Sequence, residues 1–252
     1  FDADKYGLQL IKSGDKTQPS ILSGFSFINT RNRLNMMYKN QSSSSFLFLK
    51  NGIALLLLTL TLTLSSWAPS GGSNPFVVVV DAGHGGKDAG PFNEKMINFE
   101  IAQKLQLLGD NREIKLIPVR SGDDFLSLKQ RLEIVEIHKP DLLLRLQTNT
   151  SDDPGKTGVE AFYAPRNISS EKSLKYSKIL ISHQVKEAAA TGEIKAANFR
   201  ILLEAKTPAV LLELGYLSNV AEAQKLREPD HQKKIASVIY AALQEIKALE
   251  KK

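Results

Sequence analysis

Three acidic or imidazole side chains in the C-terminal part of the sequence are candidates for hydrolytic chemistry: His84, Glu94 and Glu213. His84 lies in the segment DAGHGGKDAG, whose glycines allow the backbone to approach a ligand closely. Glu213 lies near the end of the apolar run PAVLLEL. A carboxylate in such a run is costly to bury unless it is paired, bound to a metal or exposed at a site. We therefore interpret Glu213 as functional.

The other two residues have structural alternatives. His84 is equally suited to binding a ligand and to packing inside its loop. Glu94 opens an amphipathic stretch, where an acidic side chain stabilises the positive end of a helix dipole, and without other information this role is the better interpretation. Neither a G-x-G-x-x-G nor a GKS/T pattern is present in the glycine-rich loop, which excludes a nucleotide-binding loop.

The elements that must position these residues alternate along the chain. Two of the first three apolar runs are continuous, as in buried parallel strands. The alternation predicts a three-layer α/β domain with a central, mostly parallel sheet of about six strands flanked by helices, and with ligands at the carboxyl ends of the strands. The predicted strands are 76–81, 114–119, 142–147, 159–163, 199–203 and 209–214. The predicted helices are 94–108, 126–138, 171–188 and 220–249, the last broken near Pro229.

Composition narrows the function classes. The chain has 252 residues and no cysteine, which excludes disulfides and thiolate metal sites. The net charge is +6, of which residues 1–75 carry +4, from seven basic and three acidic residues. Basic residues are not interleaved with aromatic ones, so we expect no nucleic-acid partner.

The segment 51–68, NGIALLLLTLTLTLSSWA, is uncharged and reaches the short end of a bilayer span. We expect a single transmembrane helix there, preceded by a basic cytoplasmic segment (1–50) and followed by a linker (69–75) and an extracytoplasmic domain (76–252). A cleavable signal peptide is the alternative if Met36 or Met37 is the true start.

Four sequence blocks occur in an order and spacing that resemble a known family: VVVVDAGHGGKDAG, EKMINFEIAQKL, VRSGDDFLSLKQRLEI and PAVLLELGYLSN. Over about residues 76–250 the chain resembles the zinc-dependent N-acetylmuramoyl-L-alanine amidases (amidase family 3). The resemblance implies a peptidoglycan or muropeptide substrate, Zn²⁺ as cofactor, and hydrolysis of the amide bond between N-acetylmuramic acid and L-alanine. Residues 1–70 resemble the C-terminal tail of beta-lactam-sensor-type membrane metallopeptidases, but contain no HExxH motif.

The resemblance also implies site residues. His84, Glu94 and position 147 correspond to the zinc ligands, and Glu213 corresponds to the catalytic glutamate. The family usually has Ser-Ile-His-Ala-Asn where this chain has Arg145-Leu-Gln-Thr-Asn, so Gln147 replaces a histidine. An amide oxygen is a weaker zinc ligand than imidazole, and we expect Gln147 to weaken zinc binding without abolishing it.

Arg145 supports an alternative. Strand alternation puts it on the same face as Gln147, where its guanidinium is able to pair with Glu94 or Glu213 and replace the cation. The domain would then be a metal-free pseudoamidase that binds peptidoglycan or muropeptides for sensing. Arg145 directed to solvent or to a peptide carboxylate is a further possibility. The short connection at 152–156 predicts an open groove without an inhibitory helix, and the remaining histidines are expected at the surface: His138, His183 and His231.

Overall fold

The computed structural model describes residues 74–109, 113–188 and 191–250. Their centre is a six-stranded sheet with the order β2-β1-β3-β6-β4-β5. β4 runs antiparallel to β6, and every other neighbouring pair is parallel. The mostly parallel six-stranded sheet is thus confirmed. The strands are β1 (Phe76–Ala82), β2 (Ile114–Pro118), β3 (Leu142–Asn149), β4 (Val159–Tyr163), β5 (Gly192–Ala196) and β6 (Ala209–Tyr216).

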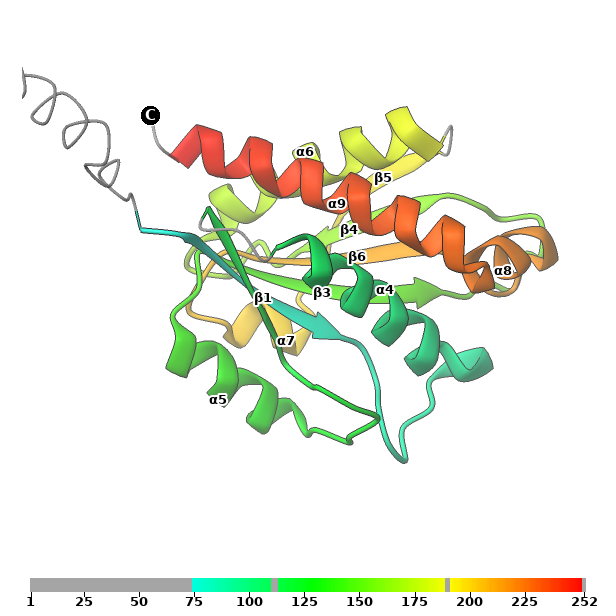
Figure 1. Cartoon of the computed structure of the whole chain (residues 1–252), viewed down its shortest axis with the longest axis horizontal. Helices are drawn as coiled ribbons and strands as arrows, with labels where there is room; N and C mark the ends of the chain where they lie inside the picture. Colours follow the sequence, from blue (N-terminus) through cyan, green and yellow to red (C-terminus); the bar gives the residue numbers. More distant parts are fainter. Residues whose placement is uncertain (1–73, 110–112, 189–190, 251–252) are drawn as a thin grey trace, which may run out of the picture. The chain divides into compact units, whose positions relative to one another are not determined.

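Helices cover both faces of this sheet, which confirms the three layers (Figure 1). One face packs against α4 (Glu94–Leu108), α6 (Ser170–Ala188) and α9 (Pro229–Glu250). The opposite face packs against α5 (Leu128–His138) and the short α7 (Arg200–Glu204). A 3-10 turn, η1 (Pro91–Asn93), precedes α4, and α8 (Val220–Arg227) precedes α9.

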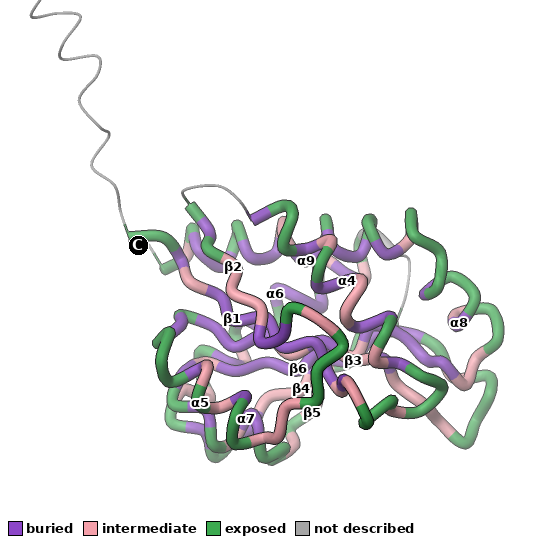
Figure 2. The backbone as a smooth tube through the Cα atoms, turned by 60° about the horizontal axis from the view of Figure 1, so that its bottom comes forward, coloured by how far each residue is buried: buried purple, intermediate pink, exposed green. Residues whose placement is uncertain are grey.

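Side-chain alternation along the strands explains the two cores. Val78 and Val80 of β1 enter the core under α4, α6 and α9, whereas Val79 enters the core under α5 and α7. Leu142, Leu143 and Leu144 are all fully buried because both faces of β3 are covered. The buried stretches in Figure 2 accordingly include the central strands.

One predicted strand is wrong. Residues 199–203 lie in α7 and its N-terminal flank, where Ile201 and Leu202 are buried against the sheet. A short apolar run does not distinguish a buried strand from a buried helical turn. The sixth strand is instead β5, whose sequence GEIKA has no apolar run because it lies at the exposed edge of the sheet. The break near Pro229 is confirmed, since α8 ends at Arg227 and α9 begins at Pro229.

The predictions for residues 1–50, for the transmembrane helix at 51–68 and for most of the linker at 69–75 lie outside the described residues. Within the described ranges, no helix has the length and apolar character needed to cross a membrane.

Candidate active site

The glycine-rich loop after β1 presents His84 at the carboxyl end of the sheet. His84, Gly85 and Gly86 all have positive φ angles, of 61°, 135° and 57°. A Cβ on Gly85 would lie 2.3 Å from the backbone oxygen of Asp124, so only glycine fits there. A Cβ on Gly90 would lie 2.9 Å from the His84 ring. The glycines therefore turn the loop back on itself and leave space for the imidazole.

The structure brings the three predicted metal ligands together. His84 Nε2 lies 2.8 Å from Glu94 Oε1 and 3.0 Å from Gln147 Nε2. Its other ring nitrogen, Nδ1, lies 2.9 Å from Asp88 Oδ1. The carboxylates raise the pKa of His84, chiefly through the contact with Glu94, although burial opposes this effect. A loop residue, the first residue of a helix and a strand residue thus converge on one point.

Glu94 is held with one oxygen directed at His84. The residue is 3% exposed and stands at the first position of α4. Its Oε2 accepts hydrogen bonds from the Thr148 backbone N–H (3.1 Å), the Thr148 hydroxyl (3.2 Å) and the Asn98 amide (3.3 Å). Because Oε2 is engaged by these donors, Oε1 is the oxygen that faces the imidazole. Glu94 can therefore stabilise the start of α4 and face His84 in the site at the same time.

Glu213 lies beside this cluster on the neighbouring strand. It is the register partner of Gln147, and its Oε2 is buried without a hydrogen-bond partner among the described residues. Burial, followed by the charges of Glu94 and Glu160, raises the pKa of Glu213 to about 7. A carboxylate with this pKa is suited to exchange protons near neutral pH.

Glu160, which the sequence patterns did not single out, faces Glu213 across the antiparallel pair of β4 and β6. It is buried and is bound by Lys195 Nζ at 2.5 Å and by the Tyr216 hydroxyl. Burial opposes its ionisation, but these hydrogen bonds hold the pKa of Glu160 below its usual value. Glu160 therefore contributes a fixed negative charge next to Glu213.

A further buried carboxylate, Asp81, lies on the other side of the site. Asp81 is fully buried and pairs with two arginines, Arg131 of α5 and Arg145 of β3. The prediction that Arg145 pairs with Glu94 or Glu213 is wrong, because Asp81 lies adjacent in register on β1. The position of Asp81 at the end of the run FVVVVD was the signal available in the sequence, since it matches the setting of Glu213.

Arg131 connects this pair to the glycine-rich loop that carries His84. Its guanidinium donates to the backbone oxygens of Leu126 (3.0 Å), Ala82 (3.2 Å) and His84 (2.8 Å) as well as to Asp81. The start of α5 that carries it is set by Ser127, whose side chain and Gln130 form a capping box. Arg131 therefore fixes the backbone on which His84 stands.

The donor set resembles a divalent-metal site with one altered ligand. His84 and Glu94 offer an imidazole and a carboxylate, and Gln147 offers a carboxamide, so no group of three His, Cys, Asp or Glu side chains occurs at a metal-binding spacing within the described residues. The arginines that neutralise carboxylates here are Arg131 and Arg145. They are outnumbered by the acidic groups around the site, which are Asp81, Asp88, Glu94 and Glu213, while the neighbouring Glu160 has its own partner in Lys195. A bound dication would balance these charges and supply a partner for the unpaired Glu213 oxygen.

A cavity of about 460 Å³ opens beside the cluster. Its wall includes His84, Gln147 and Arg145, and apolar side chains from α7 and β6 such as Ile201 and Leu211. Residues 150–158 between β3 and β4 form turns and contain no helix, in agreement with the predicted open groove. The cavity is large enough for several atoms of a ligand beside the point where His84 and Gln147 meet.

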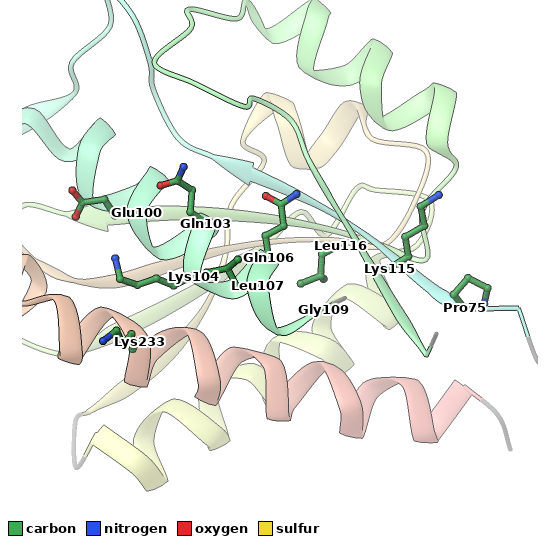
Figure 3. A pocket seen from close by; sticks show the side chains of 10 residues that line it. All are labelled: Pro75, Glu100, Gln103, Lys104, Gln106, Leu107, Gly109, Lys115, Leu116 and Lys233. Atoms are coloured by element: carbon green, nitrogen blue, oxygen red, sulfur yellow. The ribbon is translucent and has the colours of Figure 1, made fainter. Parts of the chain in front are cut away.

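The larger cavity of about 1040 Å³ contains none of the predicted site residues. Figure 3 shows it between α4, β2 and Lys233 of α9. The remaining histidines also lie elsewhere: His138 ends α5, His183 pairs with Glu245 at 2.8 Å, and His231 lies near the start of α9.

Comparison with known proteins identifies the family. Residues 78–245 match the sequence profile of the N-acetylmuramoyl-L-alanine amidases. The chain belongs to this family. The amidase domain is 28% identical to the N-acetylmuramoyl-L-alanine amidase LytC of Bacillus subtilis over 178 residues, which cover 66% of this chain and 35% of LytC.

Solved structures agree with this assignment. The catalytic domain of the amidase CwlV from Bacillus (Paenibacillus) polymyxa var. colistinus is 33% identical, with a TM-score of 0.63 over 70% of this chain and 99% of the other. An N-acetylmuramoyl-L-alanine amidase from Clostridium difficile 630 is 30% identical, with a TM-score of 0.64 over 69% and 97% of the two chains. The amidase domain therefore has the fold of peptidoglycan amidases.

Proposed function

We propose that this chain hydrolyses the amide bond between N-acetylmuramic acid and L-alanine in peptidoglycan. In this proposal Zn²⁺ is held by His84, Glu94 and Gln147, and Glu213 is the catalytic proton acceptor. The observation that carries the proposal is the convergence of these ligands beside a buried carboxyl group whose pKa is raised to about 7. Family membership identifies the bond that is cut.

The residues present fit a divalent ion. In a tetrahedral zinc site with bonds of about 2.0 Å, nitrogen and oxygen ligands are separated by about 3.3 Å. The separation of 2.8 Å between His84 Nε2 and Glu94 Oε1 is about 0.5 Å shorter than this value. Gln147 has its amide nitrogen 3.0 Å from His84 Nε2 and its oxygen 3.4 Å from Arg145 Nε, so its carboxamide must rotate for the oxygen to bind the ion. When bound, Zn²⁺ supplies Lewis acidity and lowers the pKa of a coordinated water to about 7.

The protein side chains have separate tasks in the reaction. Glu213 accepts the proton of the attacking water and returns it to the amine of the departing L-alanine. Thr148 and Asn98 hold one oxygen of Glu94, so that the other stays directed at the metal position. Arg131 fixes the backbone of His84. These contacts keep the ligands in place before substrate arrives.

Gln147 and Arg145 bear on the alternative of a metal-free domain. That alternative requires an arginine to replace the cation at the ligand carboxylates. Arg145 instead pairs with Asp81, and no arginine forms an ion pair with Glu94 or Glu213 among the described residues. Because the amide of Gln147 is a weaker ligand than imidazole, we expect lower zinc affinity than a histidine would provide.

The proposed substrate also suggests a location. Peptidoglycan lies outside the cytoplasm, so we propose that the amidase domain is extracytoplasmic and that segment 51–68 anchors it to the membrane. Protease accessibility of the domain in intact spheroplasts tests this location, and protection from protease would contradict it.

The test of the hydrolytic function compares wild type with Gln147→His and Glu213→Ala. We expect zinc-dependent release of muropeptides by wild type, tighter zinc binding by Gln147→His, and no release by Glu213→Ala despite retained zinc. Metal content by mass spectrometry and release by chromatography measure these outcomes. If only Gln147→His binds zinc and cleaves, the natural chain is not an amidase, and muropeptide binding without cleavage would support the sensing alternative.

A further inference from the structure

Asp81 has one negative charge and two guanidinium partners, and the two arginines are not equivalent. Arg131 uses all three of its guanidinium nitrogens in hydrogen bonds to Asp81 and to backbone oxygens. Arg145 uses Nη1 for Asp81 and Nε for the side-chain oxygen of Gln147 at 3.4 Å. Its Nη2 has no hydrogen-bond partner among the described residues. Arg131 is thus the structural partner of Asp81, and Arg145 retains donor capacity.

The unused donors of Arg145 belong to a side chain in the wall of the 460 Å³ cavity. The side chain is 14% exposed, and its neighbours in that wall include the apolar Ile201 and Leu211. A guanidinium in such a partly dry environment binds a carboxylate more strongly than an exposed one, because water competes less. The cavity therefore combines the catalytic cluster with a cation that is available to an anionic group.

The spacing along β3 indicates which anionic group fits. Arg145 precedes Gln147 by two residues on the same strand face, and its Nε lies 3.4 Å from the Gln147 side-chain oxygen. A carboxylate hydrogen-bonded at ~2.8 Å to the outer nitrogen of this guanidinium therefore lies about 6–8 Å from the cluster. In the stem peptide, the free α-carboxylate of a γ-linked second residue lies two residue lengths from the scissile carbonyl, also about 7 Å when extended. The sugar side of the scissile amide carries no carboxylate at that distance.

We propose that Arg145 is a specificity-determining residue that binds the free carboxylate of the second stem-peptide residue, on the leaving side of the scissile amide. This inference rests on the proposed function, because it places the scissile amide at the cluster of His84, Glu94 and Gln147. It accounts for the arginine without requiring it to replace a metal ion.

The test measures binding in a Glu213→Gln background, in which turnover is blocked. The probes are N-acetylmuramoyl-L-alanyl-D-isoglutamate and its D-isoglutamine analogue, which differ only in a carboxylate replaced by a carboxamide. We expect calorimetry to give about tenfold tighter binding of the acid, as for loss of a charged hydrogen bond. Adding Arg145→Met should remove this preference, and Arg145→Lys should retain part of it.

Arg200 provides the matched control. It lies in the same cavity wall but is 75% exposed and pairs with Glu204, so Arg200→Met should keep the preference for the acid. Equal affinity for the two probes, failure of the acid to bind, or persistence of the preference in Arg145→Met would each overturn the inference. Loss of the preference in Arg200→Met would show that Arg200 contributes to carboxylate binding, which would also contradict the assignment to Arg145.

Turnover by the wild-type chain separates this inference from the proposed hydrolysis. If the protein binds the acid more tightly but releases no muropeptide, the carboxylate subsite is supported and the hydrolytic function is refuted. Release without a preference would refute the subsite alone.

Discussion

Glu213→Gln should stabilise the metal-free protein at pH 8 while abolishing hydrolysis. Burial and the neighbouring carboxylates raise the pKa of Glu213 from 4.5 to about 7. The folded state therefore binds this proton more tightly than the unfolded state does. Its contribution to stability is fully present below pH 4.5 and is lost as the pH rises through about 7.

The magnitude follows from the shift of about 2.5 pH units. At 1.36 kcal/mol per unit, the ionised carboxylate destabilises the folded state by about 3 kcal/mol at pH 8. At pH 5, where Glu213 is mostly protonated in the folded state, the same shift destabilises the folded state by less than about 1 kcal/mol. A glutamine has no charge at either pH, so Glu213→Gln should gain about 2 kcal/mol more at pH 8 than at pH 5, relative to wild type.

Urea denaturation of chelator-treated wild type and Glu213→Gln at both pH values measures this difference. Comparing two pH values removes the effect of the unpaired polar atom, which is present at both. Glu171→Gln, an exposed position on α6, is the control and should show no comparable gain. A stability gain that is the same at pH 5 and pH 8 would refute the assignment of a strained, ionised carboxylate at Glu213.

Three further predictions concern the ligands and the loop. Gln147→His should raise Zn²⁺ affinity by at least about tenfold in chelator competition, because imidazole is the better zinc ligand, and unchanged affinity would exclude position 147 from the site. Arg131→Met should lower the free energy of unfolding by about 3 kcal/mol in urea, because it removes a buried partner of Asp81, and a loss below about 1 kcal/mol would show that Arg145 alone neutralises that carboxylate. Gly85→Ala should destabilise the protein by about 1–3 kcal/mol and weaken zinc binding, since its φ of 135° and the Asp124 oxygen at 2.3 Å exclude a Cβ, and wild-type zinc binding in this variant would contradict the role of the loop.

Much of the fold was predictable because the central strands are buried on both faces. Their continuous apolar runs, such as FVVVV before Asp81, carry a clear pattern. The edge strand β5 has exposed and half-buried residues on both faces and shows no such pattern. The short helix α7 contains the apolar run Ile201-Leu202-Leu203, which resembles that of a strand because Ile201 and Leu202 are buried against the sheet. A run of apolar residues in the sequence indicates that a segment is buried. It does not indicate whether that segment is a strand or a helical turn.

For the site, the sequence by itself determined the kinds of side chain available and their places near strand or helix ends: His84, Glu94, Gln147 and Glu213. Only the tertiary structure decided that Arg145 pairs with Asp81, because that choice depends on the register between β1 and β3. It likewise decided the raised pKa of Glu213, which requires burial together with Glu94 and Glu160 from other elements. Charge pairing and desolvation depend on distances between segments far apart in the chain, and residue order does not contain those distances.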